Sequence, residues 1–245
     1  MLISPAISHG EASQITNKEF IIMTYKEEFI EFLIECNALK FGEFELKSGR
    51  IAPYFINTGM FDTGRKIKKL GFFYAKALQE HFTDDFEGIY GPAYKGIPLC
   101  ISAAQALSDM GIDRGYVFNR KEAKTYADKS LVVGMPLTSQ TRLILVDDVI
   151  TSGKAIRESL VTLKSCNNPV VKGIVISVNR EERGKTEQNA LKEVEQILGI
   201  PIYSIVTITD IKNYLHNKKI DNKIVLDDQM LASIDSYLEE YGATV

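Results

Sequence analysis

Residues 142–155 of the chain read Arg-Leu-Ile-Leu-Val-Asp-Asp-Val-Ile-Thr-Ser-Gly-Lys-Ala, and this stretch decides the fold. Its apolar first half is typical of a buried parallel strand, and the small residues Thr151, Ser152 and Gly153 then form a turn at which a helix begins. Backbone N–H groups at a helix start lack partners within the helix and lie at the positive end of its dipole, so they can bind a phosphate. The stretch therefore predicts a strand, an anion-binding turn and a helix in direct succession.

Two carboxylates, Asp147 and Asp148, lie between this strand and the turn. Carboxylates can accept hydrogen bonds from ribose hydroxyl groups, and they can orient a hydrated Mg²⁺, which prefers oxygen ligands and keeps several waters. Because they end a strand, we expect both side chains to be open to solvent. The combination suits a sugar phosphate, and the alternative is a strand whose acidic end only caps the next helix.

The composition favours one α/β domain. The chain has 245 residues, of which 45% are hydrophobic and 25% charged, and this is enough for one substantial core. Its net charge of −3 argues against nucleic-acid binding, which usually requires a basic field. Any anion site must therefore be built from local donors.

The cysteines and the apolar runs predict the compartment. Cys36, Cys100 and Cys166 are odd in number and widely spaced, each in or beside an apolar stretch, so we expect free thiols without a disulfide framework or a zinc site. No apolar run approaches the ~20 residues that a membrane-spanning helix needs. The N-terminus lacks the basic and apolar segments of a secretory signal. We expect a cytoplasmic protein without membrane contact.

Residues 1–23 are expected to be a disordered N-terminal extension, because they show no sustained period and mix Ser, Pro, Gly, Asn and Glu. Met23 could itself be the natural start. Thr24 and Glu27 then fit a capping box, so the first helix begins there. A single domain, residues 24–245, follows.

Strands and helices alternate regularly along the rest of the chain, which predicts βαβ units and a mainly parallel sheet flanked by helices. Before this region, Gly and Pro punctuate short strands around residues 47–55. The expected strands are 88–90, 116–118, 143–146, 171–178 and 203–206, and the expected helices are 64–81, 97–110, 153–164 and 189–198.

Polar segments follow four of these strands. Ligands of such sheets bind beyond the carboxyl ends of the strands. Residues 91–96, 120–124 and 147–155 lie at such ends, and so does Arg180. We therefore expect these four segments to converge on one site.

Several motifs resemble one enzyme family. Residues 146–155 resemble the 5-phosphoribosyl-1-pyrophosphate (PRPP) signature of the type I phosphoribosyltransferases, and six further runs resemble bacterial orotate phosphoribosyltransferases in the same order along the chain. Independent motifs of this length rarely agree by chance. The runs are Leu-Lys-Phe-Gly-Glu-Phe (39–44), Leu-Lys-Ser-Gly-Arg (46–50), Pro-Tyr-Phe (53–55), Gly-Pro-Ala-Tyr-Lys-Gly-Ile-Pro (91–98), Phe-Asn-Arg-Lys-Glu-Ala-Lys (118–124) and Ile-Arg-Glu-Ser (156–159).

The resemblance implies a fold and a reaction. The fold is the type I phosphoribosyltransferase fold, a twisted sheet with a small hood from the N-terminal region. The reaction is the Mg²⁺-dependent transfer of the 5-phosphoribosyl group from PRPP to orotate, which releases pyrophosphate and forms orotidine 5′-phosphate in de novo pyrimidine (UMP) biosynthesis. The resemblance also implies a homodimer whose lid loop reaches the partner's site.

The resemblance assigns roles to residues of this chain. The amides and hydroxyls of residues 151–155 hold the 5′-phosphate, and Asp147 and Asp148 face the ribose hydroxyls and act in catalysis. Mg²⁺ is held mainly through PRPP and water near these two aspartates. The full PRPP-binding set is Lys47, Tyr94, Lys95, Arg120, Lys121, Lys124, Tyr126, Asp147, Asp148, Val149, Ile150, Thr151, Ser152, Gly153, Lys154 and Ala155.

Residues 120–124 carry three cations, and such a run is usually a solvated loop. The resemblance makes it the catalytic lid, with Lys124 as the residue that stabilises the transition state. Departure of pyrophosphate adds negative charge to that group, which cations stabilise. Closure of the lid would also exclude water.

Orotate offers a carboxylate and a flat ring. Lys47, Phe55, Ile56, Thr151 and Arg180 match the family positions that bind it. By themselves, Lys47 would be a surface lysine and Phe55 a core aromatic residue. Only the resemblance makes them site residues.

The chain departs from the family pattern at two positions. Tyr126 stands where relatives commonly have a histidine, and a phenol donates to phosphate but stays neutral near pH 7. Lys154 stands where a threonine is common. Its side chain either adds a cation beside the phosphate turn or points into solvent.

Two other functions remain open. A purine phosphoribosyltransferase would keep PRPP but would not need Lys47 and Arg180 to meet a carboxylate. A regulatory protein would bind PRPP without turnover, and loss of the lid cations would favour it. The chain retains Arg120, Lys121 and Lys124.

Overall fold

The computed structural model describes residues 23–46, 49–120, 131–150, 153–184 and 188–243. Its elements in chain order are α1 (Tyr25–Glu35), β1 (Leu39–Glu45), β2 (Ile51–Ile56), the 3-10 helix η1 (Thr58–Met60), α2 (Gly64–Phe82), β3 (Gly88–Gly91), α3 (Gly96–Asp109), β4 (Gly115–Asn119), β5 (Val132–Gly134), β6 (Arg142–Asp147), α4 (Lys154–Lys164), β7 (Val170–Asn179), α5 (Ala190–Leu198), β8 (Ile202–Thr207), α6 (Ile208–Leu215), β9 (Lys219–Ile220), β10 (Lys223–Ile224) and α7 (Asp228–Tyr241).

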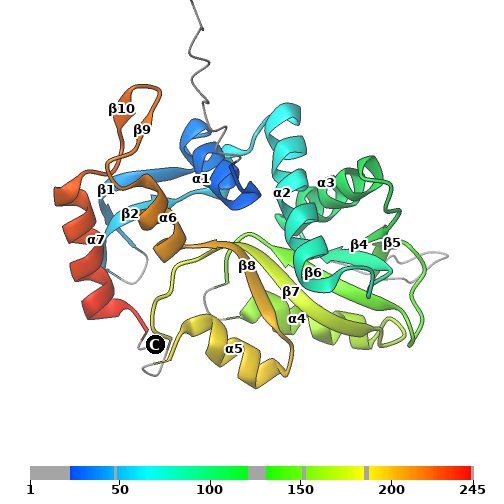
Figure 1. The fold of residues 1–245 in the computed structure, drawn as a ribbon. Coiled ribbons are helices and arrows are strands. Elements are labelled where there is room, and N and C mark those ends of the chain that lie inside the picture. The colour runs from blue at the N-terminus through cyan, green and yellow to red at the C-terminus, as the bar shows by residue number, and fades with distance from the viewer. Residues whose placement is uncertain (1–22, 47–48, 121–130, 151–152, 185–187, 244–245) are drawn as a thin grey trace, which may run out of the picture.

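A six-stranded sheet forms the centre, with the strand order β5-β4-β3-β6-β7-β8. All neighbouring strands run parallel except β4 and β5. Helices α2 and α3 cover one face and α4 and α5 cover the other (Figure 1). The alternation of helix and strand that predicted this architecture is confirmed, whereas the short antiparallel strand β5 was not predicted.

Strand β6 lies inside the sheet, and its side chains are buried on both faces. Ile144 and Val146 join the core formed with α1, α2 and α3, whereas Leu143 and Leu145 join the core formed with α4 and α5. Successive side chains of a strand point to opposite faces, so a strand covered on both sides needs a continuous apolar run. Full burial of each such side chain contributes roughly 1.5–3 kcal/mol. This burial fixes the end of β6, where the two aspartates follow.

The predicted starts of the first two helices are confirmed. Thr24 and Glu27 form the capping box of α1, in which the Thr24 backbone N–H donates to Glu27 Oε2 at 2.7 Å. Helix α2 begins at Gly64, as predicted, and its inner face is buried from Leu70 to Leu78, whereas Ile67, near the start of the helix, is half-buried.

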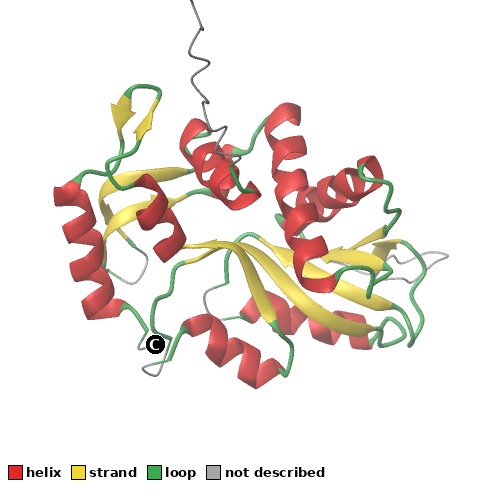
Figure 2. Cartoon of the chain, in the orientation of Figure 1, coloured by secondary structure: helices red, strands yellow, loops and turns green. Residues whose placement is uncertain are grey.

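A second unit lies at the edge of the sheet. The antiparallel pair β1 and β2 forms the predicted N-terminal hood. Helix α7 packs against β2, and the short hairpin β9–β10 lies at the same end of the molecule (Figure 2). The sequence had predicted no element after residue 206. The hood therefore combines the N-terminal hairpin with the C-terminal helix.

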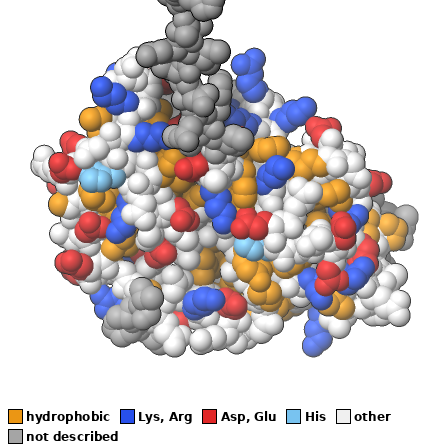
Figure 3. All heavy atoms as spheres, viewed as in Figure 1, with side chains coloured by type: hydrophobic (Ala, Val, Ile, Leu, Met, Phe, Trp, Pro, Cys, Tyr) orange, Lys and Arg blue, Asp and Glu red, His pale blue; other side chains and the backbone are white. Residues whose placement is uncertain are grey.

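The surface carries interspersed charges of both signs on the face shown in Figure 3. Cys36 and Cys100 are buried and Cys166 is half-buried, and all three are free thiols as predicted. Within the described ranges, no helix combines the length and the apolar character that a membrane crossing requires.

Candidate active site

The carboxyl ends of β3, β4, β6 and β7 lie side by side at one edge of the sheet (Figure 1). The turn 92–95 follows β3, Asp147 ends β6, and Arg180 follows β7. Asn119, the last residue of β4, joins two of these ends, because its Oδ1 accepts a hydrogen bond from Ala93 N at 2.7 Å. The topology thus brings the strand ends that carry predicted site residues to one edge.

Asp148 is held by hydrogen bonds from three other segments. Its Oδ2 accepts from Lys95 Nζ and from Thr58 Oγ1, each at 2.6 Å, and its Oδ1 accepts from Val149 N at 2.8 Å. Its backbone oxygen accepts from Ser177 N at 3.0 Å and Ser177 Oγ at 2.6 Å. Hydrogen bonds to a charged group are about twice as strong as neutral ones. The carboxylate therefore has a fixed orientation.

Asp147 has fewer polar partners. Its Oδ1 accepts from Asp148 N at 2.9 Å, and its backbone oxygen accepts from the Tyr74 hydroxyl at 2.7 Å. Asp147 and Asp148 are only 9% and 7% exposed, so the expectation that both are open to solvent is wrong. The physical reason is that η1, which carries Thr58, and the turn that carries Lys95 both pack over the end of β6.

These surroundings give the two carboxyl groups different proton affinities. Burial, followed by the negative charge of Asp148, raises the pKa of Asp147 to about 7. Burial also acts to raise the pKa of Asp148, but the hydrogen bonds from Lys95 and Thr58 outweigh it and hold that pKa below its ordinary value. Asp148 is therefore the charged member of the pair at neutral pH, and Asp147 titrates near neutrality.

Helix α4 begins where the phosphate turn was predicted to end. Gly153, its N-cap, has a φ of +66°, and a Cβ at this position would lie 2.8 Å from Val194 Cγ1. Both features favour glycine. Gly153 has no side chain that could cap the first turn of α4, and N–H groups at a helix start can donate to an anion.

The other described residues of this predicted segment flank the turn. Val149 and Ile150 are half-buried and follow the acidic pair, and Ala155 lies in the first turn of α4. The Lys154 side chain is 78% exposed, with Nζ 3.8 Å from Glu158 Oε1. Lys154 therefore pairs along the helix surface, which is the solvent-facing option that the sequence left open.

Two of the predicted pyrophosphate cations lie in the described chain, Lys95 and Arg120. The buried Nε of Arg120 has no hydrogen-bond partner among the described residues. Tyr94, in the turn before Lys95, is 64% exposed. The remaining predicted residues, Lys47, Lys121, Lys124, Tyr126, Thr151 and Ser152, lie outside the described residues and stay predictions.

The predicted orotate residues divide between the two faces of β2. Phe55 is 37% exposed and stacks on Phe44 with ring centroids 5.5 Å apart, and Ile56 is half-buried. Arg180 instead lies over the ring of Tyr54, 4.6 Å from its centroid. Tyr54 is the strand neighbour of Phe55 and points to the opposite face. The structure thus brings Arg180 to β2, but to its buried face.

Several supporting residues were missed by the sequence analysis: Thr58, Tyr74, Asn119 and Ser177. The Thr58 and Tyr74 contacts span 90 and 73 positions. No period or spacing connects such distant residues. The available signal was proximity to a motif, since Asn119 lies within the run 118–124 and Thr58 follows Ile56 closely.

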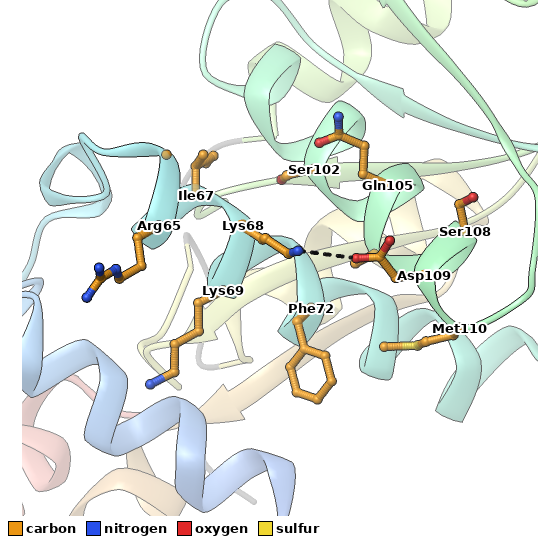
Figure 4. A pocket seen from close by; sticks show the side chains of 12 residues that line it. Arg65, Ile67, Lys68, Lys69, Phe72, Ser102, Gln105, Ser108, Asp109 and Met110 are labelled. Atoms are coloured by element: carbon orange, nitrogen blue, oxygen red, sulfur yellow. Dashed lines mark ion pairs between the residues drawn. The ribbon is translucent and has the colours of Figure 1, made fainter.

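Two cavities indicate where a ligand has room. One of about 180 Å³ lies against the acidic site, with Thr58, Lys95 and Asp148 in its lining. A larger one of about 1000 Å³ lies between α2 and α3 (Figure 4). Lys68 and Asp109 form an ion pair at 3.5 Å in its wall, but none of the predicted site residues lines it. Asp148 lines the smaller cavity, and it and the adjacent Asp147 are buried carboxyl groups whose pKa values shift in opposite directions. We therefore place the candidate active site at these strand ends.

The comparisons with known proteins agree with this location. No family model matches the chain. Orotate phosphoribosyltransferases from Clostridium acetobutylicum and Clostridium botulinum (strain Alaska E43) are 48% and 46% identical to it over 219 and 220 residues, which cover 89% of this chain and 98% of each relative. The crystal structure of orotate phosphoribosyltransferase from Francisella tularensis has a TM-score of 0.76 and 35% identity, and the match covers 88% of this chain and 100% of that one. Because this similarity extends over nearly the whole length of the relatives, the chain belongs to the orotate phosphoribosyltransferase family.

Proposed function

We infer that this protein transfers the 5-phosphoribosyl group from PRPP to orotate, giving orotidine 5′-phosphate and pyrophosphate in de novo UMP biosynthesis. One observation carries the inference beyond family membership. The buried pair Asp147 and Asp148 ends β6 immediately before the turn into α4, and Lys95 and Thr58 orient it. A ribose placed over the pair would therefore have its phosphate at the start of α4.

The donor set fits a hydrated Mg²⁺. Asp147 and Asp148 offer carboxylate oxygens, which Mg²⁺ prefers while it keeps several waters. Within the part of the chain that the structure describes, no three His, Cys, Asp or Glu side chains gather as a metal site. We therefore propose that PRPP and water would hold the ion near the two aspartates, where it would supply positive charge to the pyrophosphate group.

The remaining groups divide by charge. Residues 151–155 hold the 5′-phosphate through the N–H groups at the start of α4. Lys95 and Arg120, together with Lys121 and Lys124 of the lid, surround the pyrophosphate. The bond from ribose C1 to the pyrophosphate oxygen breaks with its electron pair on that oxygen, so these cations act where negative charge increases.

The base lies on the other side of the ribose. The N1 atom of orotate forms the new bond to C1 and gives up its proton, which leaves with the pyrophosphate or passes to solvent. Lys47, Thr151 and Arg180 supply polar contacts to the base. The segment Phe55–Ile56 is proposed to line its ring, whereas Arg180 lies at the opposite, buried face of β2 in the structure. The exposure of Phe55 beside Phe44 supports this role, because an aromatic face is left open to a planar ligand.

The functional unit is proposed to be a homodimer in which residues 120–124 of one subunit reach the phosphate turn of the other. Its two-fold axis makes both shared sites equivalent.

A single assay tests the proposed function. Loss of orotate absorbance is followed with PRPP and Mg²⁺, beside parallel reactions with adenine, hypoxanthine and uracil. We expect that orotate is turned over and that the other three bases are not. Turnover with a purine would replace the proposal by a purine phosphoribosyltransferase, and PRPP binding without turnover of any base would indicate a regulatory protein.

A further inference from the structure

The loop after β7 is tied to the C-terminal helix by its backbone. Arg183 N donates to Tyr241 O at 2.8 Å, and Ala243 N donates to Glu181 O at 2.8 Å. Hydrogen bonds therefore run in both directions between the two segments. The loop that carries Arg180 takes its path from the end of α7.

Glu182 continues this connection through side chains. Its Oε1 accepts hydrogen bonds from Arg180 Nε at 2.8 Å and Nη2 at 2.6 Å, and from the Tyr237 hydroxyl at 2.9 Å. The side chains of Arg180 and Glu182 are 21% and 17% exposed, and Tyr237 is buried. Because the same oxygen accepts from Arg180 and from Tyr237, the positions of these two side chains are coupled through one atom. One carboxylate oxygen thus sets the direction of the guanidinium.

Tyr54 supports the guanidinium from another side. The Arg180 Cζ lies 4.6 Å from the centre of the fully buried Tyr54 ring. Tyr54 and Tyr237 also meet edge to face, with ring centroids 6.0 Å apart and an interplanar angle of 84°. Because α7 packs against β2, Tyr54 of β2 and Tyr237 of α7 confine Arg180 together with Glu182.

We propose that Glu182 and Tyr237 are positioning residues for base recognition, through which α7 holds Arg180 in the orientation that orotate requires. The inference rests on the proposed assignment of Arg180 to orotate. A guanidinium has five N–H donors, and Glu182 accepts from two of its nitrogens. Glu182 also compensates the positive charge of Arg180. The contact between Arg180 and orotate therefore depends more on where the remaining N–H donors of the guanidinium point than on its charge.

Tyr237→Phe tests the proposal, because it removes the hydroxyl and keeps the ring. We expect the KM for orotate to rise roughly three- to tenfold, with kcat and the KM for PRPP within about twofold of their original values. The rise is smaller than for a direct hydrogen bond to a charged group, because the lost bond acts on orotate only through Glu182 and Arg180. Tyr214→Phe is the matched control, since its hydroxyl donates to Glu31 Oε1 at 2.8 Å outside the site. This control should change neither KM.

Two further variants complete the test. Glu182→Gln should raise the KM for orotate at least as much as Tyr237→Phe does. The double variant Glu182→Gln with Tyr237→Phe should have the same KM for orotate as Glu182→Gln alone, because Tyr237 acts through Glu182. Additive losses, or a lower Tm of Tyr237→Phe with an unchanged KM for orotate, would overturn the proposal.

Arg180→Lys separates this inference from the proposed function. If Arg180→Lys raises the KM for orotate and Tyr237→Phe does not, Arg180 binds the base without α7 and only the positioning role is overturned. If Arg180→Lys leaves the KM for orotate unchanged, the assignment of Arg180 is wrong and the positioning role falls with it.

Discussion

Lys95 and Asp148 form an ion pair at the end of β6, with Nζ 2.6 Å from Oδ2. The lysine side chain is 69% exposed and the aspartate is buried, so Lys95 covers the acidic pair from the solvent side. The same lysine is the proposed partner of pyrophosphate. Under the proposed function, Lys95 would lie between the carboxylates assigned to the ribose and the departing pyrophosphate.

Asp147 should make the stability of the ligand-free, metal-free protein depend on pH. Its pKa is raised from 3.8 to about 7, so over this interval the folded protein keeps a proton that the unfolded chain has released. The stabilising contribution is fully present below pH 3.8 and is lost as the pH rises through about 7. Asp147→Asn removes this titration.

Calorimetry of both proteins over that pH range measures the difference. We expect the Tm of the original protein to fall more steeply than that of Asp147→Asn. The lowered pKa of Asp148 makes stability rise with pH, but only at pH values below the ordinary pKa of 3.8. It therefore does not hide the effect of Asp147 at higher pH. Parallel Tm curves would contradict the raised pKa.

Thr58 should support catalysis through Asp148. Thr58→Val keeps the shape of the side chain and removes the hydroxyl that donates to Oδ2 at 2.6 Å. We expect kcat/KM for PRPP to fall by about tenfold or more, since a hydrogen bond to a charged group contributes ~1.5–3 kcal/mol. Thr58→Ser retains the hydroxyl and should restore most of the activity. Equal losses in both variants would show that the methyl group, rather than the hydroxyl, matters.

Gly153→Ala should weaken both the fold and PRPP binding. The change places a Cβ at a φ of +66° and 2.8 Å from Val194 Cγ1, and the left-handed conformation alone costs ~1–2 kcal/mol. Gly199→Ala is the matched control, because Gly199 has a φ of +65° and no atom within 4 Å of the added Cβ. Denaturant unfolding of both variants should show a larger loss for Gly153→Ala. Only that variant should raise the KM for PRPP.

A chain that starts at Met23 should keep full activity and stability. The composition of residues 1–23 predicts no buried contacts, and the capping box of α1 begins directly afterwards. Denaturant unfolding and the orotate assay compare the two chains. A loss of more than ~2 kcal/mol would require a specific burial or network mechanism and would reject the proposed extension.

Complementation should show whether the active site is shared between subunits. Lys124→Ala and Asp147→Ala are prepared separately, each nearly inactive, and an equal mixture is dissociated and reassociated. If the lid crosses the interface, each hybrid dimer has one site with both defects and one intact site. Random pairing makes about half of the dimers hybrid, so roughly a quarter of all sites should recover. Absence of recovery, with subunit exchange confirmed, would assign Lys124 to the site of its own chain.

The sequence by itself determined the central part of the fold. The apolar run of β6, the small residues after it and the helical period of α4 are local features, so their meaning does not depend on distant residues. The same holds for the capping box of α1 and for the buried face of α2. Parallel topology then required the strand ends to meet at one edge.

Tertiary structure alone decided how the site is built. The acidic pair is buried because η1 and the turn after β3 pack over it, and the Thr58 contact joins residues 90 positions apart. Likewise, α7 meets Arg180 through Glu182 and Tyr237 only because the C-terminal helix packs on the N-terminal hairpin. Such contacts leave no periodic signal along the chain, since they depend on which segments the folded topology places side by side.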